Sequence, residues 1–520
     1  MANGMASLMV GSSGLRSAQT ALNTTAHNLS NVNTQGYTRQ QVTFTDTTYA
    51  NVFSSSIVPG KYGLGVDIGA ISRVRNDFID RSYRTEYSRL GFYESQANAV
   101  YEVEDWFGEM QGVTYQQHIT DLYNSINELT KNPTSTIARS SLIQNATAFI
   151  DRSQAIYSGL KDYQITLNTE VSSMVDKINE LGQKIYSLNK SISKVESGGV
   201  ERANDLRDTR DIALDELSQY LDIDYYETTD GQIIISAENI PFVSKSEVNT
   251  MDVRQEGQYG LLIPEWPAYE KDVFNFEKAA SNANNNDKGK LKGLLVARGT
   301  IDVNYQDVPV MPDKSDYDLT TAEGMAQYNS AMDDYQKQQD YYNKYIEPSA
   351  ILSAIAGFDK LVNGIVTALN DVLCPEKEVE TTTEMTDDEG NPLQADKYVY
   401  NASQYGRLYD RFGNVVEGTD NGDGTYSYTS GEKLYIDEQH TTAEDIDSMT
   451  YLILDMDKAG FGTDEDETVG VELFKRKGTE RYIKITGEDG TTTYVRNNLN
   501  AIGYEIDYTL GNLLVNPEAS

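Results

Sequence analysis

The fold is decided by residues 167–195, which have the sequence LNTEVSSMVDKINELGQKIYSLNKSISKV. An apolar residue at every 3.5 positions on average predicts a helix that packs along one side. The helical pattern covers residues 134–196, and about 60 residues at about 1.5 Å each give a rod near 90 Å long. We expect this side to pair within the chain in an antiparallel bundle, with a coiled-coil dimer as the alternative. One row is Val171, Ile178, Ile185 and Ile192, and the other is Leu167, Met174, Leu181, Leu188 and Val195.

Further helical patterns flank this stretch on both sides. A helix over residues 76–107 is predicted from apolar spacing, and a shorter one ends before Pro133, which cannot donate a backbone hydrogen bond. Gly198 ends the long helix, and another follows at about 204–221. A further heptad row covers residues 349–373. The apolar positions of the first of these helices are Ile79, Tyr83, Tyr87, Leu90, Tyr93, Ala97, Val100 and Phe107.

The remaining segments are predicted to contain β-strands. Alternation around Asp230-Gly231 indicates a hairpin, residues 225–310 are predicted to be β-rich, and residues 322–346 form a Tyr-rich helix. We therefore predict an α+β multidomain protein, a long coiled-coil-like helical bundle with an N-terminal assembly helix and inserted β-rich outer domains. The expected parts are 1–45 (N-terminal assembly helix and Asn-rich signature), 46–230 (helical rod domain, completed by 346–374), 231–345 (β-rich region with the Tyr-rich helix) and 375–520 (acidic β-rich outer domain).

Composition excludes several functional classes. Asp and Glu number 80 against 43 Lys and Arg, a formal net charge of −37. This field repels phosphate, so we expect no nucleic-acid partner and no membrane partner. The single cysteine, Cys374, forms neither an intrachain disulfide nor a CxxC motif. There is no basic leader and no run of about 18 apolar residues, so we expect no cleaved signal peptide and no transmembrane helix.

Nothing in the sequence indicates catalysis. The GSSG segment at 11–14 lies in a helical pattern and is not a nucleophile elbow. The DNGDGT stretch at 420–425 lacks the acidic ends of a calcium loop and fits a β-turn better. The histidines have no metal-ligand spacing. We expect no enzyme activity, no cofactor and no metal site. The three histidines are His27, His118 and His440.

The first forty residues carry a different apolar row. Most of the other residues in this segment are Ser, Thr, Asn and Gln, with almost no charge. Burying four Leu side chains contributes roughly 6–12 kcal/mol, whereas ordering some 25 backbone residues costs about 25–50 kcal/mol. We therefore predict that this helix needs a partner, the alternative being that it packs on its own domain. The leucine row consists of Leu8, Leu15, Leu22 and Leu29, with Gly11, Ala18, Thr25 and Val32 between them.

Polar turn residues follow the leucine row directly. In ALNTTAHNLSNVNTQGYTRQ, residues 21–40, the Asn side chains can bond to nearby backbone and Gly36 permits a sharp turn. The order resembles the N-terminal signature of the flagellar rod, hook and hook-associated axial proteins, Asn-x-x-Asn-x-x-Thr-x-Gly-Tyr. The matching residues are Asn28, Asn31, Thr34, Gly36 and Tyr37.

Two further blocks narrow the resemblance to the hook-associated protein 1 family. Residues 63–84, GLGVDIGAISRVRNDFIDRSYR, resemble its Gly-x-Gly-Val strand, which leads through an Arg-containing turn into a long helix. Residues 204–223, NDLRDTRDIALDELSQYLDI, resemble its Asn-Asp-Leu-x-Asp-x-Arg-Asp helix. The resemblance covers about residues 5–230, with a weaker one at 349–373.

The resemblance implies an extracellular structural protein of the bacterial flagellum at the hook–filament junction, exported through the flagellar type III channel without a cleaved signal. It implies as partners the hook protein, the second hook-associated junction protein, further copies in the axial tube and an export chaperone. In that family the N-terminal helix pairs with a C-terminal helix, but this sequence ends LLVNPEAS. We therefore expect a truncated or divergent C-terminus, and poor assembly if it is truncated. The expected subunit contacts are Leu8, Leu15, Leu22, Leu29, Asn28, Asn31, Thr34, Gly36 and Tyr37.

A function of another class stays open from the sequence. A secreted coiled-coil adhesin or effector would use the Tyr-rich and acidic β regions to bind a host ligand. Such a protein would not need its first forty residues. An enzyme in the acidic C-terminal half has no motif to support it beyond abundant carboxylates.

Overall fold

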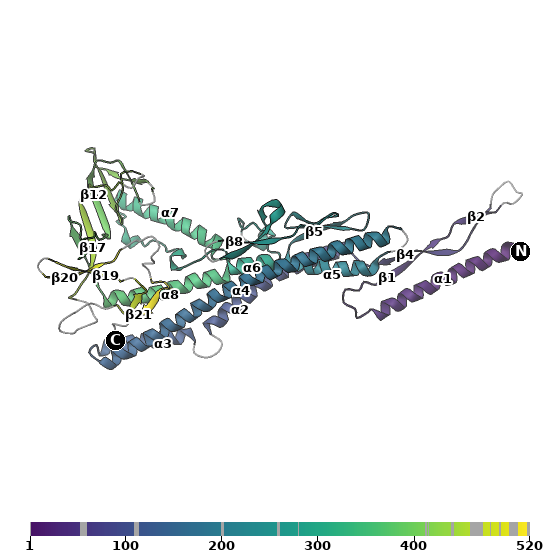
Figure 1. Ribbon diagram of the computed structural model, residues 1–520, viewed down its shortest axis with the longest axis horizontal. Coiled ribbons are helices and arrows are strands. Elements are labelled where there is room, and N and C mark those ends of the chain that lie inside the picture. Colours follow the sequence, from purple (N-terminus) through teal and green to yellow (C-terminus); the bar gives the residue numbers. More distant parts are fainter. Residues whose placement is uncertain are drawn as a thin grey trace. The chain divides into compact units, whose positions relative to one another are not determined.

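The computed structural model consists of helices and antiparallel sheets, which confirms the α+β class (Figure 1). The chain forms two compact units and passes between them within α2 (Asp77–Phe107), α4 (Thr136–Glu196), α7 (Ala322–Tyr345) and α8 (Ala350–Leu373), and once through the loop between Asp302 and Val303. Unit 1 contains Met1–Glu102, Asp162–Asp302 and Asn343–Ser353, and unit 2 contains Val103–Lys161, Val303–Tyr342 and Ala354–Ser520. The four-part division expected from the sequence stays a prediction. The structure describes residues 2–52, 60–108, 114–198, 202–256, 260–278, 280–410, 413, 415–437, 441–457, 472–478, 480–487, 490–498 and 508–516.

The helices agree closely with the apolar patterns of the sequence. The long helix is a single element of 61 residues that ends just before Gly198. The shorter helix before it ends at Lys131, directly before Asn132-Pro133. The helices are α1 Ala2–Ser30, α2 Asp77–Phe107, α3 Tyr115–Lys131, α4 Thr136–Glu196, α5 Asn204–Tyr220, α6 Lys290–Arg298, α7 Ala322–Tyr345 and α8 Ala350–Leu373.

The β-branched row of α4 is buried inside the chain. Ile178 and Ile185 have no exposed surface. Strands as well as helices cover this side of α4, because the Asn189 side chain pairs with both backbone groups of Ile233. A Cβ at Gly182 would lie 2.5 Å from the Phe242 ring, so the helix needs glycine at this close contact. The row pairs within the chain, as expected, but with a partly β partner.

The strands of unit 1 form short antiparallel sheets. The hairpin predicted at Asp230-Gly231 is confirmed, because β5 and β6 pair antiparallel on either side of it. The first ribbon, β1 with β4, connects α1 to α2. The strands are β1 Gln40–Asp46, β2 Tyr49–Val52, β3 Gly60–Gly63, β4 Val66–Arg73, β5 Ile223–Glu227, β6 Ile233–Ala237, β7 Ile240–Val243, β8 Asp252–Glu256, β9 Leu261–Trp266 and β10 Lys271–Asp272.

Helix α6 lies inside the 225–310 region that was predicted to be β-rich, so that prediction is wrong for Lys290–Arg298. The segment is short, and Gly293 in its middle weakens an isolated helix. Tertiary packing overrides this preference. A Cβ at Gly293 would lie 2.5 Å from the Phe92 carbonyl oxygen, so only glycine lets α6 approach the α2 backbone this closely.

Helix α2 buries the side opposite its apolar row. Its buried residues are mostly small or polar, whereas Ile79 is 61% exposed and Leu90 is 57% exposed. Small residues face inward because backbone approaches there, and a Cβ at Gly91 would lie 2.5 Å from the Gln219 carbonyl oxygen. The apolar row that marks this helix in the sequence is therefore largely a surface feature of unit 1.

The turn between β6 and β7 contains a buried carboxyl group. Burial raises the pKa of Glu238 to about 7, and Lys292 only partly offsets this. The unfolded chain ionises near the ordinary value, so the folded state is disfavoured progressively as pH rises from about 4.5 to about 7. We expect Glu238→Gln to be more stable than wild type by about 1–3 kcal/mol at pH 8 and about equal at pH 4. Urea unfolding at both pH values measures the difference, and an equal gain at both would contradict this cause.

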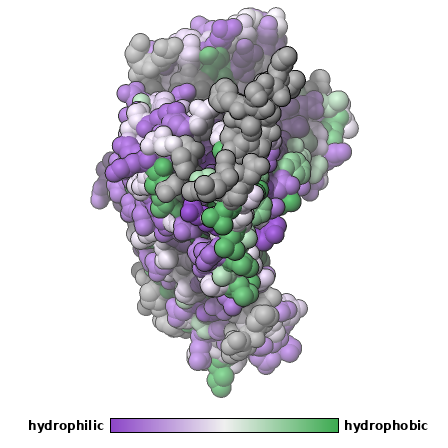
Figure 2. Space-filling model, turned by 90° about the vertical axis from the view of Figure 1, so that its right-hand side faces the viewer, coloured by the Kyte–Doolittle hydropathy of each residue, from purple (hydrophilic) through white to green (hydrophobic). Residues whose placement is uncertain are grey.

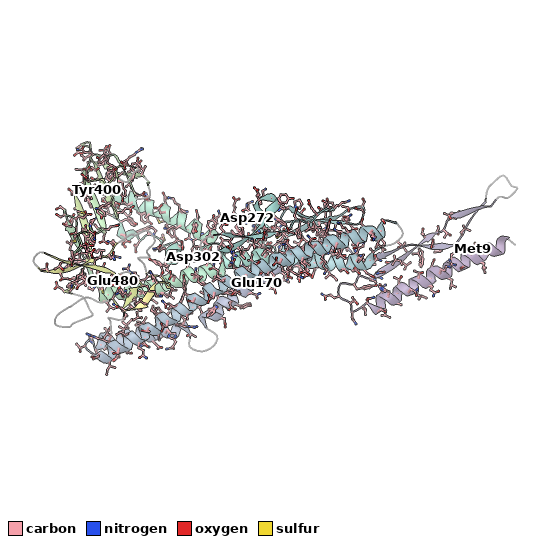
Figure 3. All side chains as sticks on the ribbon, viewed as in Figure 1. Met9, Glu170, Asp272, Asp302, Tyr400 and Glu480 are labelled. Carbon is pink, nitrogen blue, oxygen red and sulfur yellow. The ribbon has the colours of Figure 1, made fainter. Side chains whose placement is uncertain are left out.

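Unit 2 contains a seven-stranded antiparallel sheet with tyrosines in its core, one of which is labelled in Figure 3. These hydroxyls hold loops: Tyr398 accepts from the Ala395 amide and Tyr400 from the Leu434 amide. The tyrosine rings therefore pack in the apolar core, while their hydroxyl groups hydrogen-bond the backbone of neighbouring loops. The strands of unit 2 are β11 Glu376–Thr381, β12 Lys397–Ser403, β13 Arg407–Tyr409, β14 Val415–Glu417, β15 Thr419–Asp420, β16 Tyr426–Ser430, β17 Ser448–Leu454, β18 Phe474–Arg476, β19 Tyr482–Thr486, β20 Thr492–Arg496 and β21 Leu513–Val515.

Helix α8 bears on the expectation that the chain has no transmembrane helix. Within the described part of the chain it is the helix that is long and apolar enough to do so by length and composition, and 44% of its most apolar window is buried. The core helix of a folded protein passes the same test. The buried Asp359 carboxylate accepts from the backbone amides of Tyr305 and Leu510, so this helix serves as core within unit 2.

Candidate subunit-assembly surface

Helix α1 lies on the β1–β4 ribbon through hydroxyl side chains. Ser17 Oγ donates to the Val66 carbonyl oxygen at 3.3 Å, and the Val66 amide donates to Ser13 Oγ at 3.2 Å. Gly65 has a φ of +114°, and a Cβ there would lie 2.0 Å from Ser13 Oγ. The helix and the ribbon therefore approach closely on a polar, small-residue side of α1.

The leucine row lies on the exposed side of α1. Figure 2, viewed from the end of Figure 1 at which α1 lies, shows apolar residues gathered on the surface, and Figure 3 labels Met9 on this helix. Met9 is 59% exposed and Val32 is 69% exposed. Contiguous apolar surface of this kind marks an interaction site in a soluble protein. The exposed fractions of the row are 75% for Leu8, 71% for Leu15, 70% for Leu22 and 73% for Leu29.

The Asn-rich signature forms a hydrogen-bonded turn within the chain. Asn28 Nδ2 donates to the Gln40 carbonyl oxygen at 2.8 Å, and the Gln40 amide donates back to Asn28 Oδ1 at 2.9 Å. The Tyr37 hydroxyl also donates to Asn28 Oδ1, at 2.8 Å. The Asn28 side chain therefore pairs with the Gln40 backbone as a neighbouring strand would, at the start of β1.

The other signature residues shape the same turn. Thr34 Oγ1 donates to Asn31 Oδ1 at 3.1 Å, and Asn31 Nδ2 donates to the His27 carbonyl oxygen at 3.0 Å. Gly36 has a φ of +76°, and a Cβ there would lie 2.4 Å from Ile212 of α5. Glycine is needed for both reasons: the left-handed backbone and the contact with α5.

Removing the central side chain of the turn tests its role. Asn28→Ala is expected to destabilise the turn by about 1–3 kcal/mol, because the Gln40 amide and carbonyl lose their partner. Hydrogen exchange at the Gln40 amide should become faster by about tenfold or more. Asn33→Ala, at an exposed site in the same turn, serves as the control. Equal exchange in both variants would contradict a locking role for Asn28.

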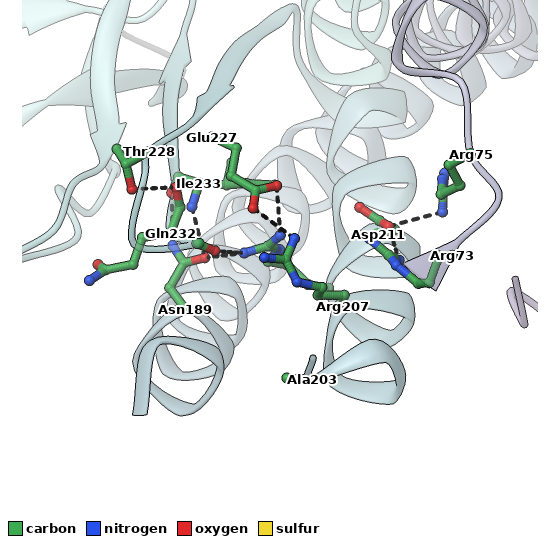
Figure 4. A network of polar contacts seen from close by, with 12 residues as sticks. Arg73, Arg75, Asn189, Ala203, Arg207, Asp211, Glu227, Thr228, Gln232 and Ile233 are labelled. Carbon is green, nitrogen blue, oxygen red and sulfur yellow. Dashed lines mark hydrogen bonds and ion pairs between the residues drawn. The ribbon is translucent and has the colours of Figure 1, made fainter. Parts of the chain in front are cut away.

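An ionic network joins the start of the chain to α5 (Figure 4). Arg73 Nη1 contacts Asp208 Oδ1 at 2.8 Å and Asp211 Oδ2 at 2.6 Å. Arg75 Nη1 contacts Asp211 Oδ2 at 3.0 Å. The Thr38 amide donates to Asp208 Oδ2 at 3.1 Å. Both sides of the ribbon, residues before β1 and residues after β4, therefore bind the same face of α5.

Burial and charge shift several pKa values in this region. Burial lowers the pKa of Arg75, but the hydrogen bond to Asp80 and the Asp211 charge outweigh it, and the pKa is raised overall. The Arg207 hydrogen bond lowers the pKa of Glu196 to about 2. Desolvation lowers the pKa of Arg210 to about 10. Arg75, Glu196 and Arg210 therefore stay charged at neutral pH.

The structure separates the expected contact residues into two sets. The leucine row is exposed on one helix, whereas the five signature residues are engaged within the chain in the turn at its end. The network residues Arg73, Arg75, Asp208 and Asp211 were missed as site residues. The sequence did contain a sign of these residues. The arginines lie in the 63–84 block, and the aspartates recur three positions apart in the 204–223 block.

The remaining candidate residues form no chemical site. Among the described residues no group of three or more His, Cys, Asp or Glu side chains is placed to hold a metal ion. His27 Nδ1 lies 2.9 Å from the Tyr37 hydroxyl, and His440 lies outside the described residues. The DNGDGT stretch connects β15 to β16, where the Asp423 carboxylate accepts from the Thr425 amide, as in a turn.

Comparisons with known proteins point to a flagellar family. The model of the flagellar hook-associated protein FlgK helical domain matches residues 100–312, and that of the flagella basal body rod protein matches residues 8–38. Flagellar hook-associated protein 1 of Bacillus subtilis (strain 168) is 29% identical over 335 residues, covering 61% of this chain and 64% of that protein. The chain is similar to flagellar hook-associated protein 1. This confirms the resemblance inferred from the three sequence blocks.

Two further proteins are similar to this chain. Flagellar hook-associated protein 1 of Escherichia coli (strain K12) is 27% identical over 228 residues, covering 44% of this chain and 41% of that protein. The structure of the flagellar hook junction protein FlgK from Burkholderia pseudomallei matches with a TM-score of 0.38 and 14% identity, covering 78% of this chain and 68% of that one. The chain thus spans less than two thirds of the length of either curated relative.

Proposed function

We propose that this chain is a structural component of the bacterial flagellum that joins hook to filament by polymerisation of its helical ends. The exposed leucine row carries this proposal. It lies on a helix that is already anchored on the other side, and within the segment matched by the rod protein family, residues 8–38. Water-exposed leucines at helical spacing are stabilised when another helix covers them.

The proposed contacts between subunits follow from this arrangement. The leucine row meets neighbouring subunits, and Asn28, Asn31, Thr34, Gly36 and Tyr37 contribute at the end of α1. The proposed partners are the hook protein, the second hook-associated junction protein and further copies of this chain in the axial tube. An export chaperone covers the row before assembly. The proposed location is the extracellular hook–filament junction, reached without a cleaved signal peptide.

In this proposal the rest of the chain gives the assembled structure its stiffness and its outer surface. Residues 1–45 form the assembly element, and residues 46–230 with 346–374 supply a stiff rod. Residues 231–345 and 375–520 face outward. The role is structural and not catalytic, in agreement with relatives that are named as flagellar hook-associated proteins. The comparisons give no support to the alternative of a secreted coiled-coil adhesin or effector.

Gene replacement tests the proposal directly. Cells that lack the gene should be non-motile and should release filament protein into the medium, because the junction on which filaments grow is missing. The full-length gene should restore filaments, and a gene lacking residues 1–40 should not. Filaments in cells that carry the shortened gene would overturn the proposal. Host-cell binding by the shortened protein in those cells would favour the adhesin instead.

A further inference from the structure

The arm, defined as residues 2–52 and 60–75, is held on α5 at two places close together in space. The first is the segment after α1, where the Thr38 amide binds Asp208 and Gly36 packs on Ile212. The second is the end of β4, where Arg73 binds both Asp208 and Asp211. Two carboxylates one helical turn apart therefore bind both the strand that leaves and the strand that returns.

These contacts are largely shielded from water. The side chains of Asp208 and Asp211 are 8% and 10% exposed, and that of Arg73 is 12% exposed. Ion pairs in such a place are screened little by salt, and removing one partner leaves a buried charge unpaired. The Asn204 side chain of α5 also donates a hydrogen bond to the Ile71 carbonyl oxygen of β4. The attachment therefore combines shielded ion pairs with hydrogen bonds to the backbone of the arm.

We propose that Asp208 and Asp211 form an ionic clasp with Arg73, Arg75 and the Thr38 amide, and that this clasp fixes the direction of the arm relative to α5. They are positioning residues, since they do not belong to the leucine row. A fixed arm presents the row in one orientation and reduces the ordering cost when a second subunit binds. This consequence for assembly rests on the proposed function, whereas the clasp itself does not.

The spread of distances between arm and body tests the clasp in the full-length monomer. Spin labels at Asn23→Cys on α1 and Ser187→Cys on α4 occupy exposed sites. Cys374 can stay, because it is buried and burial raises its pKa to about 12, which keeps its thiol unreactive. The wild-type clasp should give one narrow distance distribution. The double variant Asp208→Asn/Asp211→Asn should broaden it at least twofold.

Two further variants make the result decisive. Glu216→Gln removes a charge from the same helix and breaks its pair with Lys177 of α4, so the distribution should stay narrow. If circular dichroism shows that the double variant has lost helix, Arg73→Gln, at the end of β4, decides instead. An unchanged width in the folded double variant, or in Arg73→Gln, overturns the clasp. Broad distances with normal filament growth would keep the clasp and remove its role in assembly.

Discussion

Leu15→Asp/Leu22→Asp is expected to abolish assembly while leaving the monomer folded. The two side chains are 71% and 70% exposed, so their replacement changes monomer stability by no more than about 0.5 kcal/mol each. In an assembled state they are covered, and losing two buried leucines costs about 3–6 kcal/mol. Each 1.4 kcal/mol is about tenfold in affinity, so association should weaken by about 100-fold to 10,000-fold.

Sedimentation of the purified protein and filament counts on complemented cells measure this effect. Asn23→Asp adds a charge at an exposed position next to Leu22 but outside the row, and should leave both unchanged. Thermal unfolding of each variant checks that the monomer is intact. A variant that assembles normally, or one that melts much earlier than wild type, would show that the row is not a free contact surface.

The second large effect is expected from truncating two residues, also seven positions apart, in the buried row of α4. Ile178→Ala/Ile185→Ala should destabilise unit 1 by about 4–10 kcal/mol, since each truncation of a buried isoleucine costs about 2–5 kcal/mol. Both side chains have no exposed surface in the structure. The loss is comparable with the whole stability of a typical domain, about 5–15 kcal/mol, so the variant should be partly unfolded.

Tryptophan fluorescence during urea unfolding reports this loss. Trp266 is buried in unit 1 against Phe242, and a Trp106→Phe background removes the other tryptophan. Ile165→Ala is the matched control, because Ile165 lies on the same helix and is 62% exposed. The control should change the unfolding free energy by less than about 0.5 kcal/mol. Similar losses in the double variant and the control would mean that α4 is not the core of unit 1.

The exposed row of α1 and the buried row of α4 show how far the sequence predicts the fold. Heptad spacing places helices correctly at α1, α2, α4 and α8, because spacing depends only on local geometry. It does not reveal whether a row is covered within the chain. The α4 row is buried by strands that lie far away in sequence, whereas the α1 and α2 rows are exposed. For α2 the buried side is marked by Gly91, a residue whose role appears only when the backbone of α5 is seen beside it.

The candidate site was predictable to a similar degree. The leucine row and the Asn-rich turn follow from residue types and spacing over a few residues. Asn28 could not be assigned a partner, since its bond to Gln40 depends on how the chain returns as β1. The pairing of Arg73 with Asp211 joins residues 138 positions apart. Neither the 63–84 block nor the 204–223 block alone indicates that Arg73 pairs with Asp211.

The two-point attachment of the arm has a consequence for how the protein can vary among organisms. The ribbon between residues 40 and 73 leaves and returns at one face of α5, so its length is uncoupled from the body. Matched insertions of two residues in β1 and in β4 would keep the strand alternation, but they would move Val66 along α1 and away from Ser13 and Ser17. The ribbon can therefore be lengthened without any change in the core, whereas the reach of α1 is set by the length of α1 itself.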